Sequence, residues 1–167
     1  MLSTLRALSE WLATTPLSLT IQNVTWIIPL VQTIHILCVA AVFSSVLMVD
    51  LRLLGLVQRA QPLPSVTSRF LSRLWLFLVL LLITGSLLII GEPERSLLNP
   101  AFMLKMAMLL AVILITLLIA RPLRTNEGFW EESFGRQAAG KLIAIVSLAL
   151  WSGIIFAGRW IAYVTSL

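Results

Sequence analysis

The protein's single histidine, His35, lies inside an apolar run that begins at Val24 and carries no formal charge until Asp50. A run of this length is long enough to cross the hydrocarbon core of a bilayer as an α-helix. Because an unpaired histidine is costly at membrane depth, an ionisable residue there is a candidate functional residue. A neutral imidazole nitrogen can bind the iron of a b-type haem, so we treat His35 as a candidate metal and cofactor ligand.

Three further residues predict how such a haem would be held. Counted from the expected outer ends of their spans, His35 and Met108 both lie about eight or nine residues deep. At 1.5 Å per residue this is ~12–14 Å below the same interface, so Met108 is a candidate second ligand of the iron. Lys105 and Arg159 would lie a few ångström nearer the surface, where cations can pair with the haem propionates.

Each of these residues also has a simpler interpretation. His35 could hydrogen-bond a backbone carbonyl or a neighbouring hydroxyl, and Met108 could be a packing residue. Lys105 and Arg159 could extend to the interface because they lie near helix ends. These structural interpretations stay open beside the haem hypothesis.

A copper site is a further alternative. His35 and Cys38 are one helical turn apart, and Met103 and Met106 form another pair at helical spacing. Cu(I) favours imidazole, thiolate and thioether ligands. If Lys105 faces the interior, however, both methionines point toward a neighbouring chain or lipid, so we rank copper below haem.

Polar residues inside spans normally face the interior of a bundle, so the polar stripes of the spans should converge. Asp50 and Arg52 would then anchor the inner end of the first span, although Asp50 could instead pair with an arginine of the second span. The alternative partners of Asp50 are Arg69 and Arg73. The stripes are Gln32, His35, Val39, Val42, Val46 and Asp50 on the first span, Lys105, Met108, Val112 and Thr116 on the third, and Ser152, Arg159 and Tyr163 on the fourth.

The composition indicates what must position these residues. The chain is 59% hydrophobic and 11% charged, whereas soluble domains carry about 25% charged residues. We therefore expect an all-α fold, a four-span transmembrane helix bundle with an N-terminal amphipathic surface helix. The surface helix and a linker from Pro16 would occupy residues 1–22, and the bundle residues 23–167. The expected spans are residues 24–52, 70–91, 101–120 and 139–164, with Pro62 and Pro64 in a loop before the second.

The basic residues predict the orientation. The loops after the first and third spans, with their flanks, carry eight basic residues, and the opposite side carries four. By the positive-inside bias both termini should lie outside, which is the periplasm for a protein of the bacterial inner membrane. The larger set is Arg52, Arg59, Arg69, Arg73, Arg121, Arg124, Arg136 and Lys141, and the smaller is Arg6, Arg95, Lys105 and Arg159.

Several function classes receive no support from the sequence. The basic residues are scattered among spans, which is not the footprint of a nucleic-acid-binding face. No GxSxG, HExxH, phosphate-binding glycine loop or CxxC motif is present, so no catalytic residue is assigned. Without a cofactor, catalysis by this chain alone is not expected.

Four segments, IPLVQTIHI, VDLRLLG, NPAFMLKM and SLALWSGIIFAGRWIAY, together resemble an uncharacterised family of bacterial four-helix membrane proteins. The resemblance covers most of the chain and implies a histidine in the first span. More remotely, the context of His35 is similar to the copper-resistance D and membrane protoporphyrinogen oxidase families, whose members are associated with copper and haem. This chain has no further histidine, which departs from a haem held by two histidines of one chain.

The leading hypothesis is a small membrane redox or cofactor-binding subunit that holds haem b through His35. The alternatives are a non-catalytic assembly subunit of a larger membrane complex, and Cu(I) binding or transport. The expected partners are the lipid bilayer, other membrane subunits or a second copy, and a quinone or a periplasmic redox protein. Pairs of small residues that would let helices approach closely are Ala40 with Ser44 and Gly153 with Ala157.

Overall fold

The computed structural model describes residues 2–57, 60–123, 126, 128–161 and 163. Arg59, Arg124 and Val164, which entered the predictions above, lie outside these described residues. Helices and no strands form in the described part, which confirms the all-α prediction. The helices are α1 (Leu2–Ala13), α2 (Pro16–Asn23), α3 (Ile27–Leu53), α4 (Leu63–Gly91), α5 (Pro93–Leu97), α6 (Pro100–Leu123) and α7 (Phe134–Trp160).

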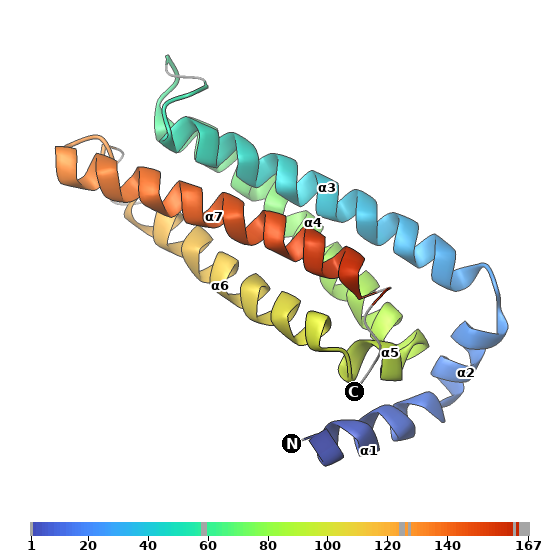
Figure 1. Cartoon of the computed structure of the whole chain (residues 1–167). Coiled ribbons are helices and arrows are strands. Elements are labelled where there is room, and N and C mark those ends of the chain that lie inside the picture. The colour runs from blue at the N-terminus through green and yellow to red at the C-terminus, as the bar shows by residue number, and fades with distance from the viewer. Residues whose placement is uncertain (1, 58–59, 124–125, 127, 162, 164–167) are drawn as a thin grey trace.

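Four of the described helices, α3, α4, α6 and α7, are long and apolar enough to cross a membrane. They lie side by side, with α3 packed against α4 and α7, and with α6 packed against α7 (Figure 1). The α3–α4 and α6–α7 connections lie together at one end of the bundle. The short helices α1, α2 and α5 lie at the other end, as does the end of α7 (Figure 1). The four helices of the described part therefore make the chain a multi-pass membrane protein.

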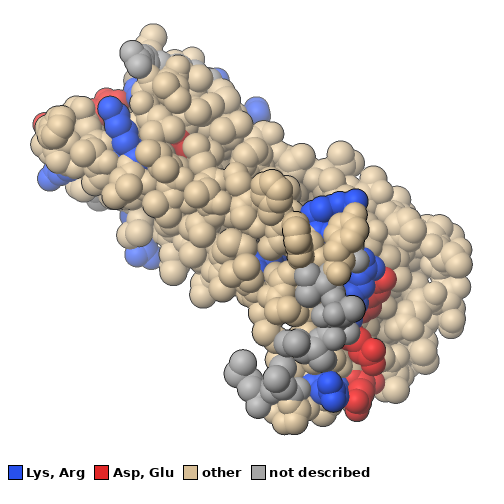
Figure 2. Space-filling model, in the orientation of Figure 1, with Lys and Arg blue, Asp and Glu red and all other residues tan. Residues whose placement is uncertain are grey.

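The core is small and contains residues from all four long helices. Its buried side chains are Val42, Val46, Leu74, Val112, Trp151 and Ile154. Outside this core, large apolar side chains remain exposed, including Leu82 at 71% and Leu110 at 61%. Figure 2 shows that the middle of the bundle is mostly uncharged on the face drawn, while Lys, Arg, Asp and Glu gather toward its ends. Such a band suits contact with lipid tails rather than with water.

The N-terminal region differs from the prediction of one helix and a linker. Residues 16–23 form the second helix, α2, because Thr15 caps it. The Thr15 side chain accepts a hydrogen bond from the Ser18 backbone N–H at 3.3 Å, and Pro16 occupies the first helical position. Proline is favourable there because that N–H would have no partner inside the helix.

The second span also begins earlier than predicted, at Leu63 rather than near residue 70. Pro62 and Pro64 were expected to keep this stretch out of the helix, but they lie at its start, where proline interrupts no backbone hydrogen bond. The fourth span likewise begins at Phe134 rather than near residue 139, because Ser133 accepts a hydrogen bond from the Arg136 backbone N–H. Both differences are local effects, a proline at the start of α4 and a serine cap on α7, that hydrophobicity does not report.

Candidate functional site

His35 is held by a hydroxyl of the neighbouring helix. Its Nδ1 lies 2.8 Å from Oγ1 of Thr84, which is a buried residue of α4. The Thr84 hydroxyl in turn donates to the Leu80 carbonyl of its own helix at 2.8 Å. A hydroxyl has one hydrogen, so if Thr84 donates it to Leu80 it accepts from His35, and the proton of the neutral imidazole is then on Nδ1. This assignment leaves the lone pair of Nε2 available to a ligand.

On the α4 side the imidazole of His35 lies next to a glycine, Gly85. A side chain added at Gly85 would place its first carbon 3.5 Å from Cε1 of His35, which is ordinary contact distance. The His35 side chain itself is half-buried. Thr84 therefore orients one edge of the ring, and Gly85 lies beside the ring without a side chain.

Lys105 lies on α6 in the same half of the bundle. It is half-buried, and its ammonium lies next to Gly158 of α7. If Gly158 carried a side chain, the first carbon would be 3.8 Å from this ammonium. The positive charge of Lys105 acts electrostatically on His35. Among the described residues, the salt bridges involve other basic side chains than Lys105. The structure thus brings one of the two predicted cations toward His35.

Met108 packs inside the bundle, whereas Arg159 contacts a residue at the C-terminal end. The Met108 sulfur lies 2.9 Å from where a side-chain carbon at Gly153 would be, so this glycine makes room for it. Met108 also packs on the buried core cluster. Arg159 is exposed, and its Nη2 donates to the Tyr163 hydroxyl at 2.8 Å. The structure supplies packing partners for both, and their roles at a haem stay predictions.

The residues of the copper alternative are spread over different environments. Cys38 is buried at 4% exposure, whereas Met106 is 44% exposed and Met103 is half-buried. Gln32, one turn before His35, is half-buried as well. In the part of the chain that the structure describes, no three His, Cys, Asp or Glu side chains are grouped closely enough to hold a metal ion.

Arg52 joins the two connections at the other end of the bundle. Its Nε and Nη2 donate to the Gln61 carbonyl at 3.1 and 2.9 Å, and Nη2 also contacts Glu131 Oε1 at 2.9 Å. Asp50, in contrast, is fully buried, and neither of its carboxylate oxygens has a hydrogen-bond partner among the described residues. The pairings suggested for Asp50 are not formed, since Arg52 is engaged elsewhere and Arg69 and Arg73 are exposed.

Two partners that matter here were not predicted from the sequence. Thr84 could have been noticed, because it opens the only run of small and hydroxyl residues, Thr84-Gly85-Ser86, inside the second span. Glu131 had no comparable signal, because it lies in a polar loop among other acidic residues. Its contact with Arg52 joins residues 79 positions apart.

Comparison with known proteins gives one result. None of the curated proteins and none of the solved structures compared with the chain matches it significantly. Residues 9–164, which include all four long helices, match the profile of one protein family. The chain therefore belongs to the family described as Family of unknown function (DUF6644).

Proposed function

We propose that this protein is a small cofactor-binding subunit of the bacterial inner membrane that holds haem b through Nε2 of His35. The observation that supports the proposal is the 2.8 Å hydrogen bond between His35 Nδ1 and Thr84, which would orient the ring with Nε2 toward a ligand. Metal-binding histidines generally donate their other ring N–H to a neighbouring acceptor, which sets both the tautomer and the ring orientation.

The surroundings of His35 fit a haem in two respects. Lys105 supplies a positive charge close enough to act on His35, and a propionate would give this half-buried ammonium a partner. Gly85 keeps the imidazole edge unobstructed. Arg159 lies farther toward the end of α7, where it would serve as a second propionate partner at the surface.

The far side of the iron has three candidate ligands. They are Met108, His35 of a second copy of the chain, and a small exchangeable ligand. The packing of the Met108 sulfur at Gly153 favours the second and third, because Met108 would have to leave the core to reach the iron. Sharing a haem between two copies would make the subunit a homodimer.

The same arrangement predicts the redox partner. With both termini in the periplasm, Lys105 and Arg159 lie toward the outer surface, and the propionates would point outward. Electrons would then be exchanged with a periplasmic protein or with a quinone in the outer leaflet.

The absorption spectrum of the purified protein tests this function directly. Protein produced with ample haem should show a Soret band, and His35→Ala should abolish it because the iron loses its ligand. Met108→Ala should change at most the potential or spin state, and Gln32→Leu, a matched substitution one turn from His35, should keep the band. Circular dichroism establishes that each variant is folded.

A wild-type protein without Soret absorbance would overturn the proposal. His35–Thr84 would then be a hydrogen bond between two helices with no cofactor. The assembly-subunit function would next be tested by the mass of the particle in mild detergent, and the Cu(I) function by copper titration of the wild type against Cys38→Ala.

A further inference from the structure

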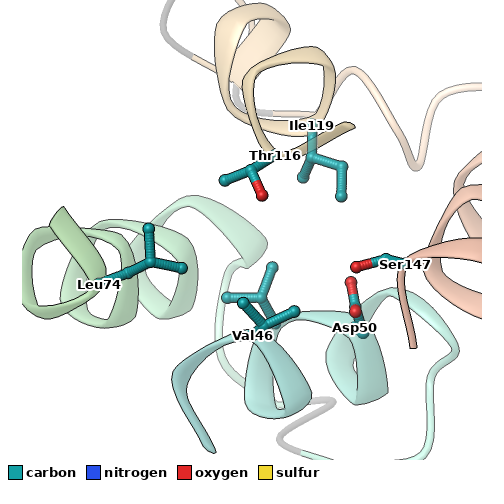
Figure 3. A pocket seen from close by; sticks show the side chains of 7 residues that line it. Val46, Asp50, Leu74, Thr116, Ile119 and Ser147 are labelled. Atoms are coloured by element: carbon teal, nitrogen blue, oxygen red, sulfur yellow. The ribbon is translucent and has the colours of Figure 1, made fainter. Parts of the chain in front are cut away.

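Asp50, the only aspartate of the chain, lines a small cavity where all four long helices meet. The cavity has a volume of about 10 Å³. Figure 3 shows Asp50 facing the hydroxyl of Ser147 across it, with Thr116 and Leu74 on the other sides. Asp50 is 0% exposed and Ser147 is 1% exposed. The lining is Val46, Val49, Asp50, Leu74, Thr116, Ile119 and Ser147.

The cavity has few hydrogen-bond donors. Thr116 uses its one hydroxyl hydrogen on the Val112 carbonyl at 2.9 Å, so toward the cavity it can only accept. Ser147 is therefore the one lining side chain that can donate to Asp50, and no hydrogen bond of normal geometry reaches either carboxylate oxygen. An ionised carboxylate has about four acceptor sites to satisfy, whereas a carboxylic acid brings its own donor for which Thr116 and Ser147 offer acceptors.

The cavity also has no positive charge to balance a carboxylate. The other lining residues from α4, α6 and α7 are not titratable. The nearest cations along the chain face elsewhere, because Arg52 binds Gln61 and Glu131 while Arg73, Arg121 and Lys141 are exposed. A buried charge without a partner is strongly disfavoured, and neutralisation by a proton removes the cost.

We propose that Asp50, Ser147 and Thr116 form a proton-binding site inside the bundle, in which Asp50 carries a proton at neutral pH. A cavity of this size holds about one water molecule, which can relay a proton between the carboxyl and the hydroxyls. This inference goes beyond the haem proposed at His35 and does not depend on it.

The geometry offers a route for proton exchange with the end of the bundle that carries the α3–α4 and α6–α7 connections. A surface pocket of about 360 Å³ opens there and is lined by Arg52, Glu131 and Gly140 among others. Ser147 follows Gly140 by seven residues on α7, which corresponds to ~10 Å along the helix axis. On α3, Arg52 lines the same pocket and follows Asp50 by only two residues, so less than one helical turn separates the buried acid from the pocket along this helix.

Infrared spectroscopy of the protein in lipid nanodiscs tests the proposal through the carbonyl stretch of a protonated carboxylic acid. At neutral pH the wild type should show this band, the band should shift in heavy water, and Asp50→Asn should lack it. Glu131→Gln, which changes an exposed acid paired with Arg52, should keep it. Ser147→Ala should shift the band without removing it, and this assigns the band to Asp50 even if Asp50→Asn does not fold.

Two results would overturn the inference. A band that is absent at neutral pH and appears only in acid would mean that Asp50 is normally ionised. A band that disappears on addition of sodium ions, but not of choline, would mean that the cavity binds a metal cation rather than a proton.

Discussion

At the scale of single residues, one hydroxyl decides what His35 can do. When Thr84 donates to Leu80 it can only accept from the imidazole, and the ring proton is then on Nδ1. The geometry of this hydrogen bond is the same whether His35 is a metal ligand or a purely structural residue. The two roles differ in what happens when the hydroxyl is removed.

Thr84→Val removes the hydroxyl while keeping the shape of the side chain. The buried Nδ1–H of His35 then loses its acceptor, and we expect a loss of about 1–3 kcal/mol in unfolding free energy. If His35 binds haem, affinity for haem should also fall, by about 10- to 100-fold.

Thermal unfolding in detergent and haem retention during washing measure the two effects. Thr84→Ser keeps the hydroxyl and is the matched control. A Thr84→Val protein as stable as the wild type would show that this hydrogen bond is not important.

At the scale of elements, α3 organises the molecule. It packs on both α4 and α7, and it carries His35 toward one end and Asp50 toward the other. The fifteen residues between them correspond to ~22 Å of helix, so the two sites lie in opposite halves of the bundle. The last turn of α3 is fixed by Arg52, whose side chain spans from Gln61 before α4 to Glu131 before α7.

Arg52 should matter more for stability than its ion pair. The side chain of Arg52 is 10% exposed, whereas that of Glu131 is 53% exposed, so solvent screens the pair. Glu131→Gln should therefore cost at most about 1 kcal/mol. Arg52→Ala should cost more, because it also leaves the Gln61 carbonyl without these two donors.

Unfolding in detergent with tryptophan fluorescence as the readout compares the two variants, since Trp130 lies beside this network. Equal losses for Arg52→Ala and Glu131→Gln would mean that the ion pair, and not the bond to Gln61, is the important contact.

At the scale of the whole molecule, the fold groups the basic residues by side. The end with the α3–α4 and α6–α7 connections carries six described basic residues, against four toward the end with α1 and α5. Those six are Arg52, Arg69, Arg73, Arg121, Arg136 and Lys141. The end with more basic residues is the same one as in the eight-to-four asymmetry of the full sequence, and this favours a cytoplasmic location for the connections.

Alkaline phosphatase fused to the C-terminus should therefore be active, because the enzyme requires the periplasm. The same reporter inserted into the α6–α7 connection should be inactive, and this is the internal control. Activity in the reverse pattern would invert the orientation, and the haem would then face a cytoplasmic partner instead of a periplasmic one.

The sequence alone was sufficient for the class of fold, because the length and hydropathy of a span depend on residues that follow one another along the chain. The existence of four long apolar helices was predictable in this way. Helix starts were less accurate at Pro16 and Leu63, where a proline that breaks a helix interior instead begins a helix. The prediction that His35 and Asp50 point toward the interior of the bundle followed from helical spacing and from the cost of polar groups in lipid.

Which residues meet was decided by the tertiary structure. His35 and Thr84 are 49 positions apart, and the Asp50 cavity needs side chains from four helices. In a membrane the lipid-facing and the buried faces of a helix are both apolar, so periodicity says little about how each helix is rotated. The rotation and relative height of α3, α4, α6 and α7 therefore determined that His35 Nδ1 meets Thr84. They also determined that Asp50 faces Ser147 in the core, with no hydrogen bond of normal geometry to either carboxylate oxygen among the described residues.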